Sequence, residues 1–268
     1  RSPPLYSSAA SDVYKRQILD TAQPAVDTVE SVNALIYGDS GAGKTYFAGS
    51  GRDKGKNDLI VAIEHGTVST ARAGSHVNII NIESWEQLLE VVQAVCDEPE
   101  RFDWVIIDSL TKMQDLIWTD ILDKAVRSNP NRSPYKRELQ EYGEAQMRMK
   151  SVVERLNGSD ANILYTSLAE LHTDEESNEF QMPMLHGQKG GLSAWACAQM
   201  DLVGYLSVAK SKDKLYRRFQ FFKTPEAFGK DRFSLFSKPL ANLTLAKLSE
   251  KLLAGNVEEV SEKKKEEK

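Results

Sequence analysis

Short apolar runs rich in β-branched residues alternate with stretches of helical periodicity through the first 170 residues of the chain. The runs predict strands at 32–37, 58–63, 77–82, 104–107 and 162–167. The stretches between them predict helices at 44–49, 85–96, 110–126 and 136–156. This alternation is typical of an α/β protein, in which crossover helices connect the strands of a mostly parallel sheet.

Beyond residue 170 the pattern changes to paired apolar runs separated by polar residues. The dipeptide Ser177-Asn178 favours a hairpin turn, and a Lys-Ser-Lys-Asp-Lys segment at 210–214 separates a second pair of runs. We therefore predict C-terminal antiparallel strands at 171–176 with 179–185, and at 200–209 with 215–224. Because no repeat and no linker divides the chain, we expect one domain over 18–254.

The two ends of the chain have a different character. Residues 12–17, Asp-Val-Tyr-Lys-Arg-Gln, resemble the translation of a transposon end used as a sequencing adapter. We therefore expect residues 1–17 to be disordered read-through and exclude them from the fold. Residues 255–268 are a mixed Glu/Lys run, which predicts a solvated, disordered tail.

Composition narrows the classes of protein that the chain can belong to. The net charge of −5 argues against indiscriminate binding of nucleic acid. Cys96 and Cys197 lie far apart without metal-ligand spacing, which suits a reducing cytoplasm. The four histidines have no such spacing either. No apolar stretch approaches the roughly 20 residues of a membrane-spanning helix, so we expect a cytoplasmic protein with no membrane partner.

The most specific motif follows the first predicted strand. It reads Gly38-Asp39-Ser40-Gly41-Ala42-Gly43-Lys44-Thr45 and matches the phosphate loop G-x-x-x-x-G-K-[ST]. Its glycines let backbone N–H groups surround an anion, and the start of the next helix adds a positive dipole end. Lys44 is expected to reach the β- and γ-phosphates, and the Thr45 hydroxyl to bind Mg²⁺. The motif predicts a nucleoside triphosphate and Mg²⁺ as ligands.

Two carboxylates end strands that are predicted to lie beside this loop. Asp108 follows Trp104-Val105-Ile106-Ile107, the pattern of a strand whose terminal carboxylate holds Mg²⁺. Glu64 follows Leu59 to Ile63, and a carboxylate at that edge could orient the attacking water. From position alone, Glu64 could equally be an ordinary surface residue.

Together these motifs resemble the RecA-type ATPase core: GDSGAGKT, then Ile-Glu-His-Gly about twenty residues later, then Val-Ile-Ile-Asp-Ser-Leu. The resemblance implies a RecA-like P-loop NTPase fold in which Glu64 is the catalytic base and Asp108 binds the metal. A polar sensor of the γ-phosphate, commonly Gln, ends a further strand in that family. In this chain Thr166 or Ser167 occupies its place.

A second resemblance concerns Gly229-Lys230-Asp231-Arg232-Phe233, which is similar to the Lys-x-Arg-Phe motif of RadA-type and hexameric-helicase proteins. It implies that Lys230 and Arg232 act in trans on a neighbour's γ-phosphate, within a homo-oligomeric ring or filament. The compact layout looks most like phage RecA-like ATPases, some of them associated with single-strand annealing (the Sak group). The resemblance implies DNA recombination or replication in a bacterial host, with single-stranded DNA and a single-strand-binding protein as partners.

Three segments are candidates for contact with single-stranded DNA. Residues 210–238 hold nine Lys/Arg against three acidic residues, and phenylalanines 219, 221, 222, 228 and 233 are interleaved with them. Residues 127–137 form a proline-broken basic and aromatic segment, and residues 186–191 a Gly-rich basic one. Each has a simpler interpretation, as core phenylalanines, a solvated connection or a turn.

Two other functions share the phosphate loop. A nucleoside or nucleotide kinase would need an Arg-rich lid, for which 127–137 is the candidate, but would leave Glu64, Lys230 and Arg232 unexplained. An assembly protein could use ATP to stabilise an oligomer with little turnover. The sequence lacks the Asn-Lys-x-Asp motif of GTP-specific proteins and the Leu-Ser-Gly-Gly signature of transporter ATPases.

Overall fold

The computed structural model describes residues 31–51, 57–63, 77–187, 191–212 and 214–252. All of them lie in one compact unit, Ser31–Lys268. The two ends that we expect to be disordered, 1–17 and 255–268, lie outside the described residues.

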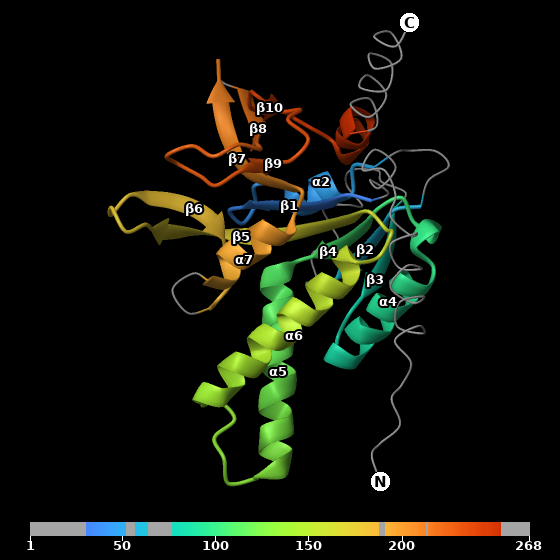
Figure 1. The fold of residues 1–268 in the computed structure, drawn as a ribbon, viewed down its shortest axis with the longest axis vertical. Helices are drawn as coiled ribbons and strands as arrows, with labels where there is room; N and C mark the ends of the chain where they lie inside the picture. The colour runs from blue at the N-terminus through green and yellow to red at the C-terminus, as the bar shows by residue number, and fades with distance from the viewer. Residues whose placement is uncertain (1–30, 52–56, 64–76, 188–190, 213, 253–268) are drawn as a thin grey trace, which may run out of the picture. The chain divides into compact units, whose positions relative to one another are not determined.

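A mostly parallel sheet forms the centre of this unit (Figure 1). The described strands follow the order β10-β8-β7-β1-β5-β4-β2-β3, with β6 paired to β5 and β9 to β7. Pairing is parallel from β7 through β1, β5, β4 and β2 to β3, and antiparallel for β6, β8, β9 and β10. The bounds are β1 Asn33–Gly38, β2 Leu59–Ala62, β3 Asn78–Asn81, β4 Val105–Asp108, β5 Ile163–Thr173, β6 Glu179–Pro183, β7 Leu202–Ser211, β8 Lys214–Gln220, β9 Lys230–Asp231 and β10 Leu240–Ala241. The predicted α/β class with C-terminal antiparallel strands is confirmed.

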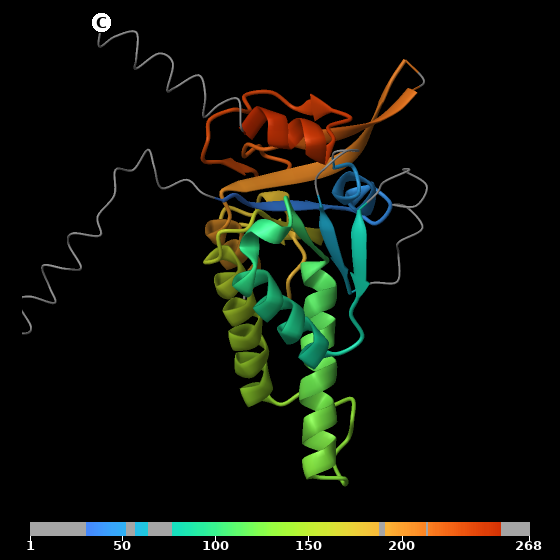
Figure 2. The same ribbon diagram turned by 90° about the vertical axis from the view of Figure 1, so that its right-hand side faces the viewer.

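The helices connect the strands and cover both faces of the sheet (Figures 1 and 2). They are α2 Lys44–Ala48, α4 Trp85–Asp97, the short 3₁₀ helix η2 Pro99–Arg101, α5 Leu110–Ser128, α6 Leu139–Asn157, α7 Gly191–Gln199 and a last helix at 245–252. The sequence did not predict α7, which starts in the Gly-rich segment and is built largely of small residues. None of the helices in the described ranges is long and apolar enough to cross a membrane.

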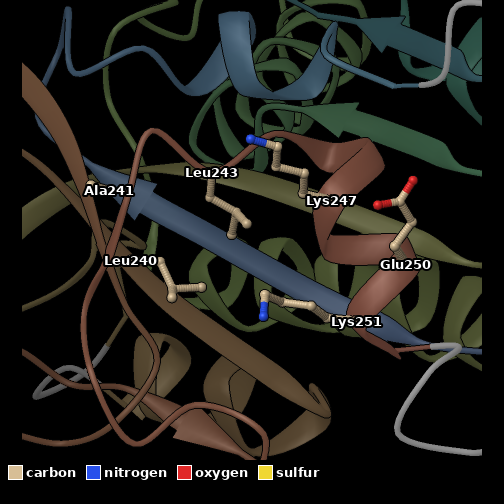
Figure 3. Close-up of a pocket in the computed structure, with 6 residues that line it drawn as sticks. All are labelled: Leu240, Ala241, Leu243, Lys247, Glu250 and Lys251. Atoms are coloured by element: carbon tan, nitrogen blue, oxygen red, sulfur yellow. The ribbon is translucent and has the colours of Figure 1, made fainter.

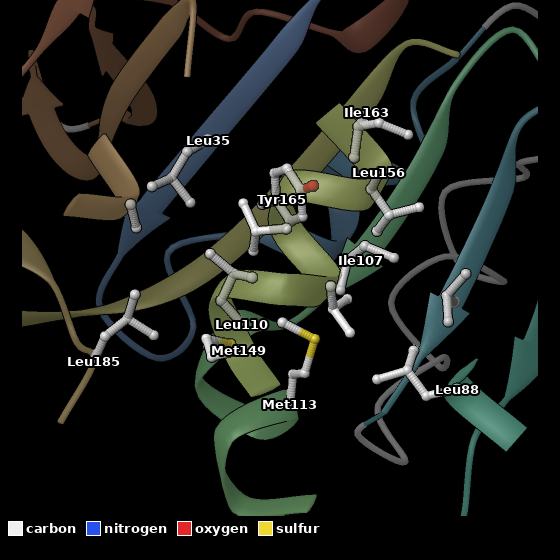
Figure 4. Packing of buried hydrophobic residues seen from close by; sticks show 14 of the residues in the cluster. Leu35, Leu88, Ile107, Leu110, Met113, Met149, Leu156, Ile163, Tyr165 and Leu185 are labelled. Carbon is white, nitrogen blue, oxygen red and sulfur yellow. The ribbon is translucent and has the colours of Figure 1, made fainter. Parts of the chain in front are cut away.

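Successive side chains of β1 point alternately into two hydrophobic cores, one on each face of the sheet. Leu35 and Tyr37 belong to the larger core, beneath α4, α5, α6 and α7 (Figure 4). Ala34 and Ile36 point to the opposite face and pack with residues of α2, β8 and the last helix. Because successive strand residues face opposite sides, a strand with both faces covered reads as a continuous apolar run. This explains why β1 was visible in the sequence.

Hydrogen bonds at their first turns fix where the long helices begin. The Ser109 side chain accepts from the Lys112 N–H at the start of α5, directly after β4. Glu138 and Glu141 form a reciprocal capping box at the start of α6. Helices α5 and α6 form a long hairpin that extends away from the sheet (Figure 1). Their connection therefore lies far from the ends of the strands.

Both predicted hairpins are present, with different bounds. β5 is one continuous strand to Thr173, because its second half pairs with β6 after its first half has paired with β1 and β4. β7 pairs with β1 as far as Tyr205 and continues with β8 to Ser211. The β7–β8 hairpin consequently extends beyond the carboxyl end of β1 (Figure 2).

Candidate nucleotide site

The phosphate loop connects the end of β1 to α2. Gly41 and Gly43 have φ angles of 79° and 103°, which L-residues with a side chain rarely adopt. A Cβ at Gly38 would lie 2.1 Å from the Leu206 carbonyl oxygen, so the adjacent strand leaves room only for glycine. The Lys44 ammonium is held inside the curve of the loop, where it donates to the carbonyl oxygens of Gly38 and Asp39 at 2.8 Å each. Each glycine and the lysine of the motif thus has a geometric reason.

Thr45 and Asp108, which the sequence predicts to bind the metal, are in contact. The Thr45 hydroxyl donates to Asp108 Oδ2 at 2.9 Å. The Thr166 hydroxyl donates to the other carboxylate oxygen, Oδ1. β5 lies between β4 and β1 in the sheet. Thr45, which follows β1, nevertheless reaches Asp108 at the end of β4, because the carboxyl ends of parallel strands lie on the same side of the sheet. We call these three side chains the hydroxyl–carboxylate corner.

This corner offers oxygen atoms only, which is the donor set that Mg²⁺ prefers. Mg²⁺ is commonly held by one or two protein groups, with phosphate oxygens and waters completing its shell. Within the described ranges, no three His, Cys, Asp or Glu side chains gather as ligands for a metal. Because phosphate oxygens and waters usually complete the Mg²⁺ shell, Thr45 and Asp108 fit an ion that is bound together with a nucleotide.

The two candidate sensor residues face opposite ways. Thr166 is fully buried against Asp108, whereas the Ser167 hydroxyl lies 3.0 Å from the Thr111 hydroxyl at the start of α5. Neighbouring residues of a strand point to opposite faces, so only one of the pair can face the phosphate loop. The structure brings Thr166 to the loop and ties Ser167 to the helix that follows Asp108.

Glu64, the predicted catalytic base, lies outside the described residues. The strand that precedes it in the sequence, β2, is described. β2 pairs with β4, and the Ile63 N–H donates to the Asp108 carbonyl oxygen at 3.0 Å. The described part of this segment therefore ends, at Ile63, beside Asp108.

A basic residue that the sequence did not single out lies on the opposite flank of the loop. Arg217 of β8 places its guanidinium over the Tyr46 ring, with Cζ 4.1 Å from the ring centroid. A Cβ added to Gly43 would lie 2.2 Å from Arg217 Nε, so this side chain rests directly on the loop. From the sequence, Arg217 is only one of nine basic residues, because nothing in the sequence shows that β7 pairs with β1 and so brings β8 beside the loop.

Lys230 and Arg232 lie toward the other end of the sheet. β9 pairs with the first residues of β7, level with the start of β1 rather than with the phosphate loop. Arg232 forms an ion pair with Asp201 at 2.8 Å, and Lys230 donates to the carbonyl oxygens of Cys197 and Ala198. Burial, followed by the nearby Arg232 charge, lowers the pKa of Lys230. Neither side chain reaches the phosphate loop of its own chain.

The candidate DNA segments differ in what they expose. Phe219 and Phe221 are fully buried, and Phe228 and Phe233 pack against the cores. The expectation that interleaved phenylalanines offer stacking surfaces is therefore wrong for these four, because the alternating pattern belongs to core-facing positions. The lysines at the tip of the β7–β8 hairpin are exposed: Lys210, Lys212 and Lys214.

In the 127–137 segment, two of the arginines have partners within the α5–α6 hairpin. Arg132 pairs with Glu141 at 2.7 Å, and Arg137 lies over the Trp118 ring at 4.3 Å. Tyr135 is 92% exposed and remains available to a partner. In the third candidate, residues 188–190 lie outside the described residues.

A separate hollow of about 480 Å³ lies between β10 and the last helix (Figure 3). It is lined by Leu240, Ala241, Leu243, Lys247, Glu250 and Lys251. None of these belongs to the phosphate loop or the hydroxyl–carboxylate corner, so the hollow is not part of the nucleotide site.

The fold and this site define a nucleotide-binding protein of the P-loop ATPase class. A family model described as an AAA domain matches residues 30–233, so the chain belongs to the AAA domain family. The structure is also similar to that of a KaiC-like protein from the hyperthermophilic archaeon Pyrococcus horikoshii OT3. That match has 15% sequence identity and a TM-score of 0.42, and covers 72% of this chain and 78% of the other. A search of curated proteins gave no match.

Proposed function

We propose that this protein is a Mg²⁺-dependent ATPase of RecA type that acts on single-stranded DNA. The observation that carries the proposal is the contact of Thr45 with Asp108 beside the phosphate loop. Hydroxyl and carboxylate are the two protein groups by which P-loop NTPases hold the metal of Mg–ATP.

Each residue of the site then has a chemical task. Lys44 would bind the β- and γ-phosphates, and Thr45 with Asp108 would hold the metal, which would supply positive charge near the transferred phosphoryl group. Thr166 orients the Asp108 carboxylate through its hydrogen bond. Glu64 orients the attacking water, a role supported by the approach of β2 to Asp108.

The β7–β8 hairpin supports the DNA part of the proposal. It presents Lys210, Lys212 and Lys214 beyond the edge of the sheet that carries the phosphate loop. Because the phenylalanines of this region are used in the cores, we expect binding to rest on phosphate contacts and to depend strongly on salt. A role in phage recombination or replication, with a single-strand-binding protein nearby, follows from the family resemblance of the motifs.

We further propose that the protein acts as a homo-oligomer. Lys230 and Arg232 lie away from the phosphate loop of their own chain, so a γ-phosphate contact from them requires a neighbouring subunit. Such an arrangement would couple hydrolysis to assembly, in a ring or a filament.

The kinase alternative is less well supported. α5 begins two residues after Asp108, and its 19 residues rise about 28 Å. The 127–137 segment that could serve as a lid follows the far end of this helix. Arg132 and Arg137 are also held by Glu141 and Trp118. A lid over the phosphates would need both to be released.

The proposal is tested by ATP turnover with Mg²⁺, with and without a single-stranded oligonucleotide, at low and moderate salt. We expect stimulation by the oligonucleotide that weakens as salt rises. We expect Glu64→Gln to abolish turnover and retain ATP binding, and Lys44→Ala to weaken binding. Retained turnover in Glu64→Gln would remove that residue from the mechanism. ATP binding with negligible turnover by the unsubstituted protein would favour the assembly alternative.

The DNA surface has a matched control in the same chain. Replacing the three tip lysines, 210, 212 and 214, by alanine should reduce oligonucleotide stimulation and flatten its salt dependence. Replacing the exposed lysines 223, 238 and 247 removes the same charge outside the tip and should leave the stimulation intact. Equal losses from the two triple variants would show a net-charge effect and contradict a surface at the hairpin tip.

A further inference from the structure

Arg217 is placed on the phosphate loop by its backbone as well as by its side chain. Its N–H donates to Asn242 Oδ1 at 3.0 Å, and its carbonyl oxygen accepts from the Asn242 N–H at 2.8 Å. On the other side, Arg217 pairs with Val208 of β7, the strand beside β1. The backbone at Arg217 is thus held from both sides.

The N–H groups of the Arg217 guanidinium remain available as hydrogen-bond donors. Among the described residues no carboxylate lies within ion-pair distance of it, and its ring partner Tyr46 engages only its face. Its neighbour Arg218 points to the other side of β8, where it donates to Gln220 at 3.1 Å and lies 3.9 Å from Glu226. A guanidinium presents planar, fixed donors that suit phosphate oxygens. Of these two neighbours, Arg217, which lies on the loop, is the one for which the described residues supply no carboxylate partner.

The layout of the site determines which part of a nucleotide would meet Arg217. The hydroxyl–carboxylate corner lies on the β4–β5 flank of the loop, and a metal held there requires the β- and γ-phosphates on that side. Arg217 and Tyr46 lie toward the β7–β8 flank, at the junction between loop and α2. The remaining part of the nucleotide, from the α-phosphate to the nucleoside, is therefore directed toward this second flank.

We infer that Arg217 is a nucleotide-binding residue that acts in cis on the phosphate chain near the α-phosphate, and that the Tyr46 ring packs against the nucleoside. The inference rests on the proposed nucleotide site and adds a second, base-side flank to it. It assigns a charge contact to Arg217 and an aromatic contact to Tyr46. The two residues should consequently respond differently to changes in the ligand and in salt.

The inference is tested by equilibrium binding of Mg–ADP, which needs no turnover. We expect Arg217→Met, which keeps the side-chain stem over Gly43, to raise the dissociation constant about tenfold. Its affinity should also depend less on salt than that of the unsubstituted protein. Tyr46→Leu should weaken binding about threefold with an unchanged salt dependence. Arg218→Met removes the same charge from the next position and should bind as the unsubstituted protein does.

The possible failures are distinguishable. If the unsubstituted protein binds neither ADP nor ATP, the proposed function itself is overturned, and the inference with it. If it binds ADP and Arg217→Met binds equally well, only the inference is overturned. A lower melting temperature of Arg217→Met with an unchanged dissociation constant would mean that Arg217 merely packs on Tyr46, which also overturns it. Partial recovery of affinity in Arg217→Lys, which restores charge without the planar donors, supports it.

Discussion

The two flanks of the phosphate loop are built in contrasting ways. On the β4–β5 flank, Thr45, Asp108 and Thr166 come from three elements, and both hydroxyls donate hydrogen bonds to the Asp108 carboxylate. On the β7–β8 flank, one long side chain, Arg217, lies over a glycine and an exposed aromatic ring, with its anchors in the backbone. The β4–β5 flank holds individual oxygen atoms in fixed positions, whereas the β7–β8 flank places one positive charge over the surface of the loop.

This difference matches what each flank would have to do. Phosphoryl transfer needs the metal ligands fixed in position, because small displacements of a reacting group are costly. Binding of the rest of a nucleotide needs charge and apolar surface, which tolerate adjustment. We therefore expect changes on the β4–β5 flank to affect mainly turnover, and changes on the β7–β8 flank to affect mainly affinity.

The largest expected effect comes from Asp108→Asn. The amide keeps the shape of the side chain and can still contact Thr45 and Thr166, but it removes the negative charge that faces the metal. Turnover with Mg²⁺ should fall about 100-fold or more, whereas ADP binding in the absence of Mg²⁺ should change little. The checks are steady-state ATP hydrolysis and nucleotide titration in the presence of a chelator.

Asp115→Asn is the matched control, because Asp115 is exposed on α5 and its one ion pair within the described residues is with Lys112, at 3.3 Å. We expect unchanged turnover and a change in the free energy of unfolding within about 0.5 kcal/mol. If Asp108→Asn retained most of its turnover, the β4–β5 flank could not be the metal side of the site.

A smaller effect separates the two neighbours Thr166 and Ser167. Thr166→Val removes the hydroxyl that bonds to Asp108 and should reduce turnover about tenfold, because one carboxylate oxygen loses its donor. Ser167→Ala removes the contact with Thr111 and the hydrogen bond to the Leu168 carbonyl oxygen, neither of which involves Asp108, and should lower the free energy of unfolding by about 1 kcal/mol with turnover retained. Parallel measurement of hydrolysis and of denaturant unfolding tests both. Equal losses of turnover would show that the two hydroxyls do not act on separate faces.

Most residues of the β4–β5 flank could be predicted from the sequence, whereas few residues of the β7–β8 flank could. Thr45 and Asp108 could be predicted together because each ends or follows a buried strand of a parallel sheet, where motif and position coincide. The choice between Thr166 and Ser167 could not be made, since a shift of one residue along a strand reverses which side chain faces the loop. That register is set by the pairing of β5 with β1 and β4.

Arg217 could not be predicted because its position depends on the pairing of β7 with β1. The sequence indicated the strands that became β7 and β8, but not that β7 would pair with β1 and place β8 beside the loop. The same limitation applies to the phenylalanines, whose alternation was visible but whose buried face was not. Local motifs could therefore be predicted from the sequence, whereas contacts between strands far apart in the sequence are defined only by the tertiary structure.

The smallest expected effect concerns the anchor of the β7–β8 flank, Asn242, whose φ of 49° glycine adopts without strain. Asn242→Gly removes the side-chain acceptor for the Arg217 N–H but keeps its own N–H bond to the Arg217 carbonyl. Because one of the two hydrogen bonds between Arg217 and Asn242 is left, the dissociation constant for Mg–ADP should rise only about two- to threefold, with no loss of turnover at saturating ATP. Ser234→Gly, at a φ of 56°, is the control for placing glycine at a positive φ and should leave the dissociation constant unchanged. A fall in saturated turnover for Asn242→Gly, without a change in affinity, would contradict the division of tasks between the two flanks.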